Sequence, residues 1–146
     1  MMPTHFLRRT LLFAGLLAAG GAVASTDSVQ KNYRLYCMGC HQADGTGSPA
    51  NGIPSMRDEV GHFLRVPGGR AYLSQVPGTL HTPLGDGETA ALLSWVMVNI
   101  GRSSTPADFQ PYTAAEVKSY RASVPDDIPG LRVKLLEQLE QRARRH

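Results

Sequence analysis

Two cysteines and one histidine between residues 37 and 41 form the most informative motif of the chain, in the order Cys37-Met38-Gly39-Cys40-His41. The chain contains 2 cysteines in all, so both belong to this motif. Two thiols at C-x-x-C spacing can form thioethers with the two vinyl groups of one porphyrin, and the histidine that follows is then placed to bind the iron. The motif predicts one covalent haem c, attached through Cys37 and Cys40, with His41 as the proximal iron ligand.

Three other uses of a C-x-x-C motif agree less well with this sequence. A structural zinc site normally has four Cys or His ligands, and the chain contains no second C-x-x-C and no H-x-x-x-H. A thioredoxin-like dithiol belongs to a βαβ context, which the flanking residues do not predict. A disulfide between cysteines this close would close a very short loop and stabilise little. Haem attachment is therefore the favoured interpretation.

The first 24 residues predict a secretory signal peptide. Arg8 and Arg9 precede an apolar run over residues 10–23, and Ala22-Val23-Ala24 has the small-x-small pattern of a cleavage site. The run is shorter than the roughly 20 residues that a membrane-spanning helix needs, although retention as an anchor is the alternative. We therefore expect export to the periplasm, with no stable membrane span after cleavage. An oxidising compartment also suits the thiols before haem is attached.

The positive charge of the sequence comes mostly from this segment. The full chain has 15 Lys and Arg against 12 Asp and Glu, a formal net charge of +3. Removing residues 1–24 takes away Arg8 and Arg9 and no acidic residue, which leaves +1. No binding to nucleic acid is predicted from so small a charge. Residues 25–146 are a normal length for one domain.

The rest of the sequence predicts helices joined by loops, with no alternating strand pattern. The first helix is expected to begin at a cap formed by Asp27 and to lead into the cysteine motif. Residues 42–54 are rich in Gly and Pro and predict a loop. Further helices are expected over residues 55–63, 69–76, 86–100 and 113–123, and from Pro129 to near the C-terminus.

Two of these helices have a clear apolar face. In the helix expected over residues 86–100, with Asp86 as its cap and Gly101 at its end, the apolar stripe consists of Leu93, Val96, Met97 and Ile100. In the last helix the stripe consists of Leu131, Leu135 and Leu139. Thr113 and Glu116 have the spacing of a capping box at the start of the helix expected over residues 113–123. The pattern as a whole is all-α.

These helices, with the Cys37–His41 motif on the first of them, resemble a class I c-type cytochrome over roughly residues 27–101. The resemblance implies an all-α, cytochrome c-like domain around one covalent haem, in which the N-terminal helix crosses a late helix. In that family an aromatic residue often lies near the crossing, and Trp95 resembles this residue by its place in the sequence. The implied division is a signal peptide over 1–24, a haem domain over 25–101 and a C-terminal helical extension over 102–146.

The resemblance leaves the distal side of the iron open. Members of the family usually supply a methionine from the loop before the late helix, but residues 76–84 contain no methionine and contain His81 instead. Imidazole binds haem iron well, so His81 is the candidate distal ligand. The weaker alternatives are Met97 and Met56. His62 is interpreted as a surface or propionate-facing histidine, and Met38, between the two cysteines, points away from the iron. A vacant sixth position is a further possibility.

The function that these features favour is periplasmic electron transfer, in which the iron alternates between Fe(II) and Fe(III). The sequence has no other arrangement of catalytic side chains, so an enzyme is not the first interpretation. The expected partner is a periplasmic redox protein such as a dehydrogenase or an oxidase, met through a small interface. The alternatives are a haem subunit of an oxidoreductase complex, docked through residues 102–146, and a haem enzyme or ligand-binding protein with an open sixth position.

Overall fold

The computed structural model describes residues 25–145, and the expected signal segment lies outside them. The described residues form helices and loops, with one isolated antiparallel bridge between Ser48 and Ile53 and no other β structure. The all-α prediction is therefore confirmed. The α-helices are α1 (Thr26–Tyr36), α2 (Met38–His41), α3 (Gly69–Gln75), α4 (Pro77–Leu80), α5 (Asp86–Val96), α6 (Ala114–Arg121) and α7 (Ile128–Ala143). The 3₁₀ segments are η1 (Pro49–Asn51), η2 (Val60–Arg65) and η4 (Arg102–Ser104), and η3 (Met97–Gly101) is a π-helix.

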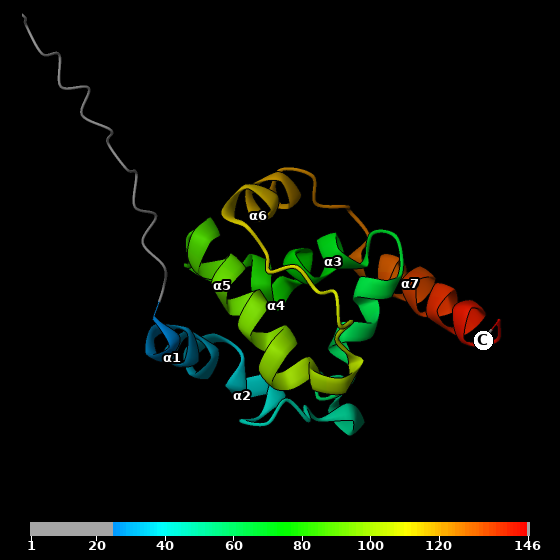
Figure 1. The fold of residues 1–146 in the computed structure, drawn as a ribbon, viewed down its shortest axis with the longest axis horizontal. Coiled ribbons are helices and arrows are strands. Elements are labelled where there is room, and N and C mark those ends of the chain that lie inside the picture. Colours follow the sequence, from blue (N-terminus) through cyan, green and yellow to red (C-terminus); the bar gives the residue numbers. More distant parts are fainter. Residues whose placement is uncertain (1–24, 146) are drawn as a thin grey trace, which may run out of the picture.

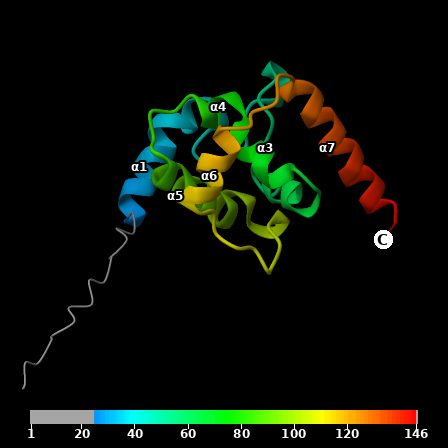
Figure 2. The ribbon, with the colours of Figure 1, turned by 90° about the horizontal axis from the view of Figure 1, so that it is seen from above.

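The helices are arranged around α5, which runs through the middle of the molecule (Figure 1). Helix α1 packs against α5 on one side, and α6 packs against both α5 and α3. Helix α7 packs against α3 and η2. Figures 1 and 2 both place α1 and α7 at opposite ends of the molecule. The buried core shared by these elements includes Tyr33, Phe63, Leu93, Met97, Val117 and Leu135.

The starts of two helices differ from the expected caps. Helix α1 is capped by Ser25, whose side chain accepts a hydrogen bond from the Ser28 amide, while Asp27 lies in the first turn. Helix α5 begins after Gly85, whose amide donates to the Glu88 carboxylate. In both cases an acidic residue in the first turn favours the positive end of the helix dipole without being the cap.

The first helix after the cysteine loop also starts later than predicted. The expected helix over residues 55–63 is replaced by a turn followed by η2, and no side chain caps this segment. Asp58 has a positive φ of 55°, which lies outside the right-handed helical region. The amide of Asp58 donates instead to the carbonyl of Ile100, which ties this turn to the end of η3.

The late helix changes its hydrogen-bonding pattern near its end. The sequence predicts an α-helix up to Ile100, but the α-helix ends at Val96 and continues as the π-helix η3. The hydroxyl of Thr105 donates to the Met97 carbonyl at 2.7 Å, so that carbonyl has a partner from outside the helix. Gly101 has an ordinary helical φ, and a Cβ there would lie 2.7 Å from the Thr105 hydroxyl. Close packing explains this glycine.

Charged and amide side chains fasten residues 105–123 to the helices beneath them. Arg70 of α3 forms a bidentate ion pair with Glu116, with its Nε 2.8 Å from Oε1 and a terminal nitrogen 3.2 Å from Oε2. It also donates to the carbonyls of Gln110 and Pro111 and lies 4.0 Å from the ring centre of Tyr112. We call these residues the Arg70 cluster. The predicted capping box of Thr113 and Glu116 is confirmed within it.

Helix α7 buries the stripe that its sequence indicates. Leu135 has an exposed fraction of 0%, and Leu131 and Leu139 pack at the edge of the core. Asp127 caps the helix by accepting from the Gly130 amide, and Pro129 lies in the first turn. Among residues 25–145, no helix is both long and apolar enough to cross a membrane.

Candidate functional site

The cysteine motif lies where α1 ends and α2 begins. Cys37 is the C-cap of α1 and is half-buried, while Cys40 is in α2 and is exposed. Burial raises the pKa of the Cys37 thiol to about 11, and the neighbouring Cys40 adds to the shift. The two thiols are unpaired, so both are free to react with a porphyrin.

His41 is oriented by a backbone carbonyl from across the loop. Its Nδ1 lies 3.2 Å from the carbonyl oxygen of Pro54. Because a carbonyl can only accept, Nδ1 carries the proton in this hydrogen bond, and Nε2 keeps a free lone pair. Burial lowers the pKa of His41, an effect that the hydrogen bond to Pro54 opposes. The chain therefore presents an imidazole with a fixed tautomer and one nitrogen available to a metal.

Two glycines allow the loop to approach His41 so closely. Gly47 has a φ of +65°, and its amide donates to the His41 carbonyl. A Cβ at Gly47 would lie 2.6 Å from the Pro54 carbonyl oxygen, which is the acceptor for His41. Gly45 has a φ of +82°, and a Cβ there would overlap the Ile100 side chain. A residue with a side chain at Gly47 would therefore displace the group that orients the imidazole.

Tyr33 joins the motif to the core. Its ring is 2% exposed and lies 5.2 Å from the ring of Trp95, where α1 crosses α5. Its hydroxyl donates to the carbonyl of Gln42 at 2.9 Å, directly after the motif. Burial raises the pKa of Tyr33 to about 12, so the hydroxyl keeps its proton and remains a donor. Trp95 thus lies at the crossing for which the sequence singled it out.

The apolar face of α1 continues past the point where the protein covers it. Val29 and Tyr33 are buried on this face, but Tyr36, one turn further on, is 36% exposed, and Met38 is exposed next to it. Tyr36 directly precedes Cys37 and Met38 lies between the two cysteines, so both exposed side chains belong to residues next to the haem attachment points. The residues present therefore fit a covalent haem: two free thiols, one oriented imidazole and an adjacent apolar surface.

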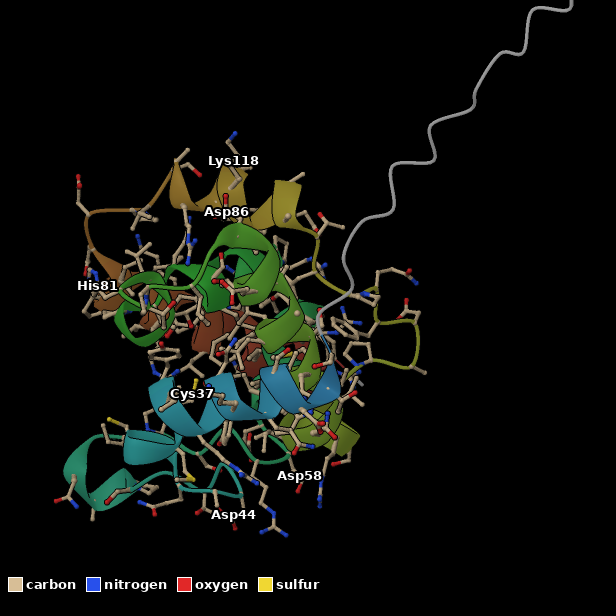
Figure 3. The ribbon with its side chains drawn as sticks, turned by 90° about the vertical axis from the view of Figure 1, so that its left-hand side faces the viewer. Cys37, Asp44, Asp58, His81, Asp86 and Lys118 are labelled. Atoms are coloured by element: carbon tan, nitrogen blue, oxygen red, sulfur yellow. The ribbon has the colours of Figure 1, made fainter. Side chains whose placement is uncertain are left out.

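The distal candidates lie in different parts of the structure. His81 is the C-cap of α4 and is exposed, and in the view of Figure 3 it lies above and to the left of Cys37. Met97 is 0% exposed in η3, and Met56 is partly buried beside the core. His62 is in η2 between two buried residues. These placements leave His81 as the exposed candidate on the side of the cysteines.

Comparison with known proteins identifies the family. No protein-family model matches the sequence. A cytochrome c-552 of Thermus thermophilus is 32% identical over 151 aligned residues, which cover 88% of this chain and 98% of the relative. The chain belongs to the monohaem c-type cytochromes. A second cytochrome c-552 from the same species is 32% identical over 119 residues, covering 68% of this chain and 90% of the relative.

Membership of this family confirms the resemblance and the cofactor that the motif predicted. The protein is a cytochrome with one covalent haem c, and its helical architecture is that of the family. Its general activity is haem-based electron transfer. The division of the sequence at residue 101 stays a prediction. The roles of individual residues toward the haem are taken up as proposals below.

The sequence did not reveal the groups that support His41. The Pro54 carbonyl is a backbone atom, and side-chain types do not indicate where such an atom will point. The hydroxyl of Tyr33, which donates to the Gln42 carbonyl, was not indicated by the sequence either. The density of glycines between Gly45 and Gly52 was the available signal, because glycines at positive φ mark a loop that bends toward another group.

Proposed function

We propose that this cytochrome is a periplasmic electron carrier whose haem is bound by thioethers to Cys37 and Cys40 and by the imidazole of His41. The iron alternates between Fe(II) and Fe(III) and makes no bonds to a substrate. The observation that carries the proposal is the hydrogen bond from His41 Nδ1 to the Pro54 carbonyl, with both thiols of the motif unpaired. This combination holds Nε2 ready for an iron next to two attachment points.

Each supporting residue has a separate task in this proposal. Pro54 sets the orientation of the His41 ring and keeps its tautomer, which also raises the basicity of the ligating nitrogen. Tyr33 holds the chain after the motif against α1 through the Gln42 carbonyl. The haem, when bound, supplies an iron that accepts and returns one electron. Tyr36 and Met38 would be covered by it, which keeps water from part of the ring.

The compartment and the partner follow from the same chemistry. The predicted signal peptide directs the chain to the periplasm, where haem c is attached after export. A redox partner such as a dehydrogenase or an oxidase would bind briefly at the end of the molecule that contains α1 and α2. The exposed Leu35 beside this motif, at 60% exposure, is an apolar side chain suited to a small, transient interface.

A permanent subunit of an enzyme complex is less well supported. That alternative needs residues 102–146 as a docking arm, but α7 packs its apolar stripe against α3 and η2 of its own chain. Residues 110–123 are likewise engaged with Arg70 and Gln75. A carrier that dissociates from its partners is therefore the better interpretation, and a monomer at micromolar concentration is the expected state.

Purified protein expressed with the haem-attachment machinery tests the proposal. The mass should exceed that of the polypeptide by one haem, and the haem should stay bound in denaturant. The holoprotein should be reduced and reoxidised repeatedly by small redox mediators without change in mass. The matched variants are Cys40→Ser, which should retain one thioether, and Ser48→Ala, which should behave as the parent. Haem that washes out in denaturant would sink the proposal.

A further inference from the structure

We propose that His81 supplies the sixth ligand of the iron, so that the haem of this cytochrome lies between two imidazoles. The inference rests on the proposed attachment through Cys37, Cys40 and His41. It departs from the methionine that the family usually supplies, and it follows from where the structure places each methionine and histidine of residues 25–145.

Met97 is held in the core and faces no open side of the molecule. It is 0% exposed, with Val96 before it and Ile100 after it also buried. Its carbonyl accepts a hydrogen bond from the Thr105 hydroxyl at 2.7 Å, which fixes the backbone of η3 at this residue. Moving the thioether to an iron would require η3 to unwind and would leave a cavity in the core. Withdrawing a buried methionine from the core destabilises the fold, so this exchange is unfavourable.

Met56 lies on the same side of the site as His41. Its amide donates to the Gly45 carbonyl at 2.7 Å, and Gly45 belongs to the loop that folds against His41. Pro54, the acceptor for the His41 imidazole, is two residues before Met56. A sixth ligand must approach the iron from the face opposite to His41. Met56 is therefore placed for packing beside the proximal imidazole.

The two remaining alternatives are also badly placed. Met38 lies between the two cysteines in α2, the same short helix that contains His41, so it cannot reach the opposite face. His62 is in η2, which packs against α7. The ring centre of its neighbour Phe63 lies 5.6 Å from the Arg132 guanidinium of α7, and Figure 1 shows α7 at the end of the molecule opposite to α1.

His81 has the placement that the others lack. It follows α4 in the connection from α3 to α5, and its amide donates to the Pro77 carbonyl. The prolines at 77 and 83, and the hydrogen bond from the Thr82 hydroxyl to the Thr79 carbonyl, restrict this connection. The ring is exposed and makes no hydrogen bond to residues 25–145. In Figure 3 it lies on the side of the molecule that shows Cys37.

A second imidazole changes the chemistry that the site supports. Methionine ligation raises the reduction potential of a haem c, and replacing it with histidine lowers the potential. Two strong-field protein ligands also leave no position for carbon monoxide or another small ligand. The proposal therefore describes a low-potential carrier that is closed to gases, and it excludes the alternative of a ligand-binding protein.

Spectra of the holoprotein test the inference. We expect a low-spin ferric haem with the magnetic resonance signature of two imidazoles, no charge-transfer band from a thioether, and slow or absent binding of carbon monoxide to the ferrous form. His81→Ala should give a high-spin ferrous haem that binds carbon monoxide at once. Added imidazole should restore the low-spin spectrum, which a purely structural role of His81 would not allow. His62→Ala is the matched control and should match the parent spectrum.

If His81→Ala does not give folded protein, His81→Met tests whether residue 81 supplies the sixth ligand. It should show the thioether band and a higher reduction potential than the parent. A thioether band in the unmodified protein, or rapid carbon monoxide binding by it, overturns this inference while leaving the covalent haem in place. Absence of covalent haem overturns the proposed attachment as well, so the two failures are distinguishable.

Discussion

The end of the molecule that contains the cysteine motif and the side that contains the Arg70 cluster are stabilised in different ways. Around the motif, the loop is held by backbone hydrogen bonds, glycines at positive φ, the His41 and Tyr33 contacts and one exposed Arg57–Asp44 ion pair, and apolar side chains remain exposed. Around Arg70, an arginine satisfies a carboxylate and two carbonyls, and these residues line an open pocket. The first region depends on a cofactor for completion, and the second does not.

Removal of both attachment points should produce the largest effect. Cys37→Ser with Cys40→Ser should abolish covalent haem and leave Tyr36 and Met38 facing water. We expect a loss of stability comparable with the whole free energy of unfolding, on the order of 5 kcal/mol or more. Circular dichroism during thermal unfolding of parent and variant measures it. A double variant that unfolds at the parent temperature would show that the motif end does not need the haem.

Breaking the Arg70 cluster should be the next largest change. Arg70→Met would leave the carbonyls of Gln110 and Pro111 without their Arg70 donor. It would also take the ion-pair partner from Glu116, whose carboxylate keeps only its hydrogen bonds from Thr113. Removing one partner of a partly buried ion pair can cost about 3–5 kcal/mol, and solvent access to this pair reduces our expectation to about 2–3 kcal/mol. Denaturant unfolding gives the value.

The haem spectrum of Arg70→Met tests whether the Arg70 cluster and the motif end are independent of each other. It should be unchanged in Arg70→Met, because the hydrogen-bond partners of Arg70 are Gln110, Pro111 and Glu116, none of which belongs to the motif or its loop. Arg144→Met is the matched control, since the Arg144–Glu140 pair is exposed at 3.7 Å and should contribute less than about 0.5 kcal/mol. A spectral shift in Arg70→Met would contradict the independence of the two regions.

Gly47→Ala should have a smaller cost but should act on the motif end alone. The new Cβ would meet the Pro54 carbonyl oxygen, and the alanine would have to adopt a φ of +65°. Such strain costs about 1–3 kcal/mol. Because Pro54 orients His41, the reduction potential should also change, which voltammetry can measure. Gly52→Ala is the control, since that glycine also has a positive φ but has open space around it. Equal potentials in the two variants would argue against a role for Pro54.

Acid should weaken the Arg70 cluster, and this is the smallest of the four expected effects. The Arg70 guanidinium lowers the pKa of Glu116 to about 2, from 4.5 in the absence of such contacts. This stabilisation is fully present above about pH 5 and is lost as the pH falls toward 2. Solvent access limits it to about 1–2 kcal/mol. Glu116→Gln should be less stable than the parent at pH 7 and should show a shallower decline between pH 5 and 2. If the stability of both proteins falls equally between pH 5 and 2, groups other than Glu116 cause the acid sensitivity.

The same two regions differ in how far the sequence predicted them. The motif, the helical pattern and the stripes on α5 and α7 follow from residue types and spacing, because side chains define them. The capping box at Thr113 was predicted for the same reason. The partners of Arg70 were not predicted, since two of them are the backbone carbonyls of Gln110 and Pro111. The support of His41 by Pro54 escaped prediction because the acceptor is again a backbone atom.

Helix boundaries show the same limit. The α-helix from Asp86 ends at Val96 and continues as a π-helix, in which the Met97 carbonyl accepts from the Arg102 amide and also from the Thr105 hydroxyl, a partner outside the helix that the apolar pattern does not indicate. The cap at Ser25 replaced the expected Asp27 because both residue types can perform that task, and the backbone decides between them.

The distance between α1 and α7 in Figures 1 and 2 has a use in practice. The C-terminal end of α7 offers exposed arginines at 142, 144 and 145, and it projects from the end of the molecule opposite to the motif. A linker fixed there would attach the protein to an electrode or a bead with the cysteine end turned outward. Every molecule on such a surface would present the same face to an arriving partner.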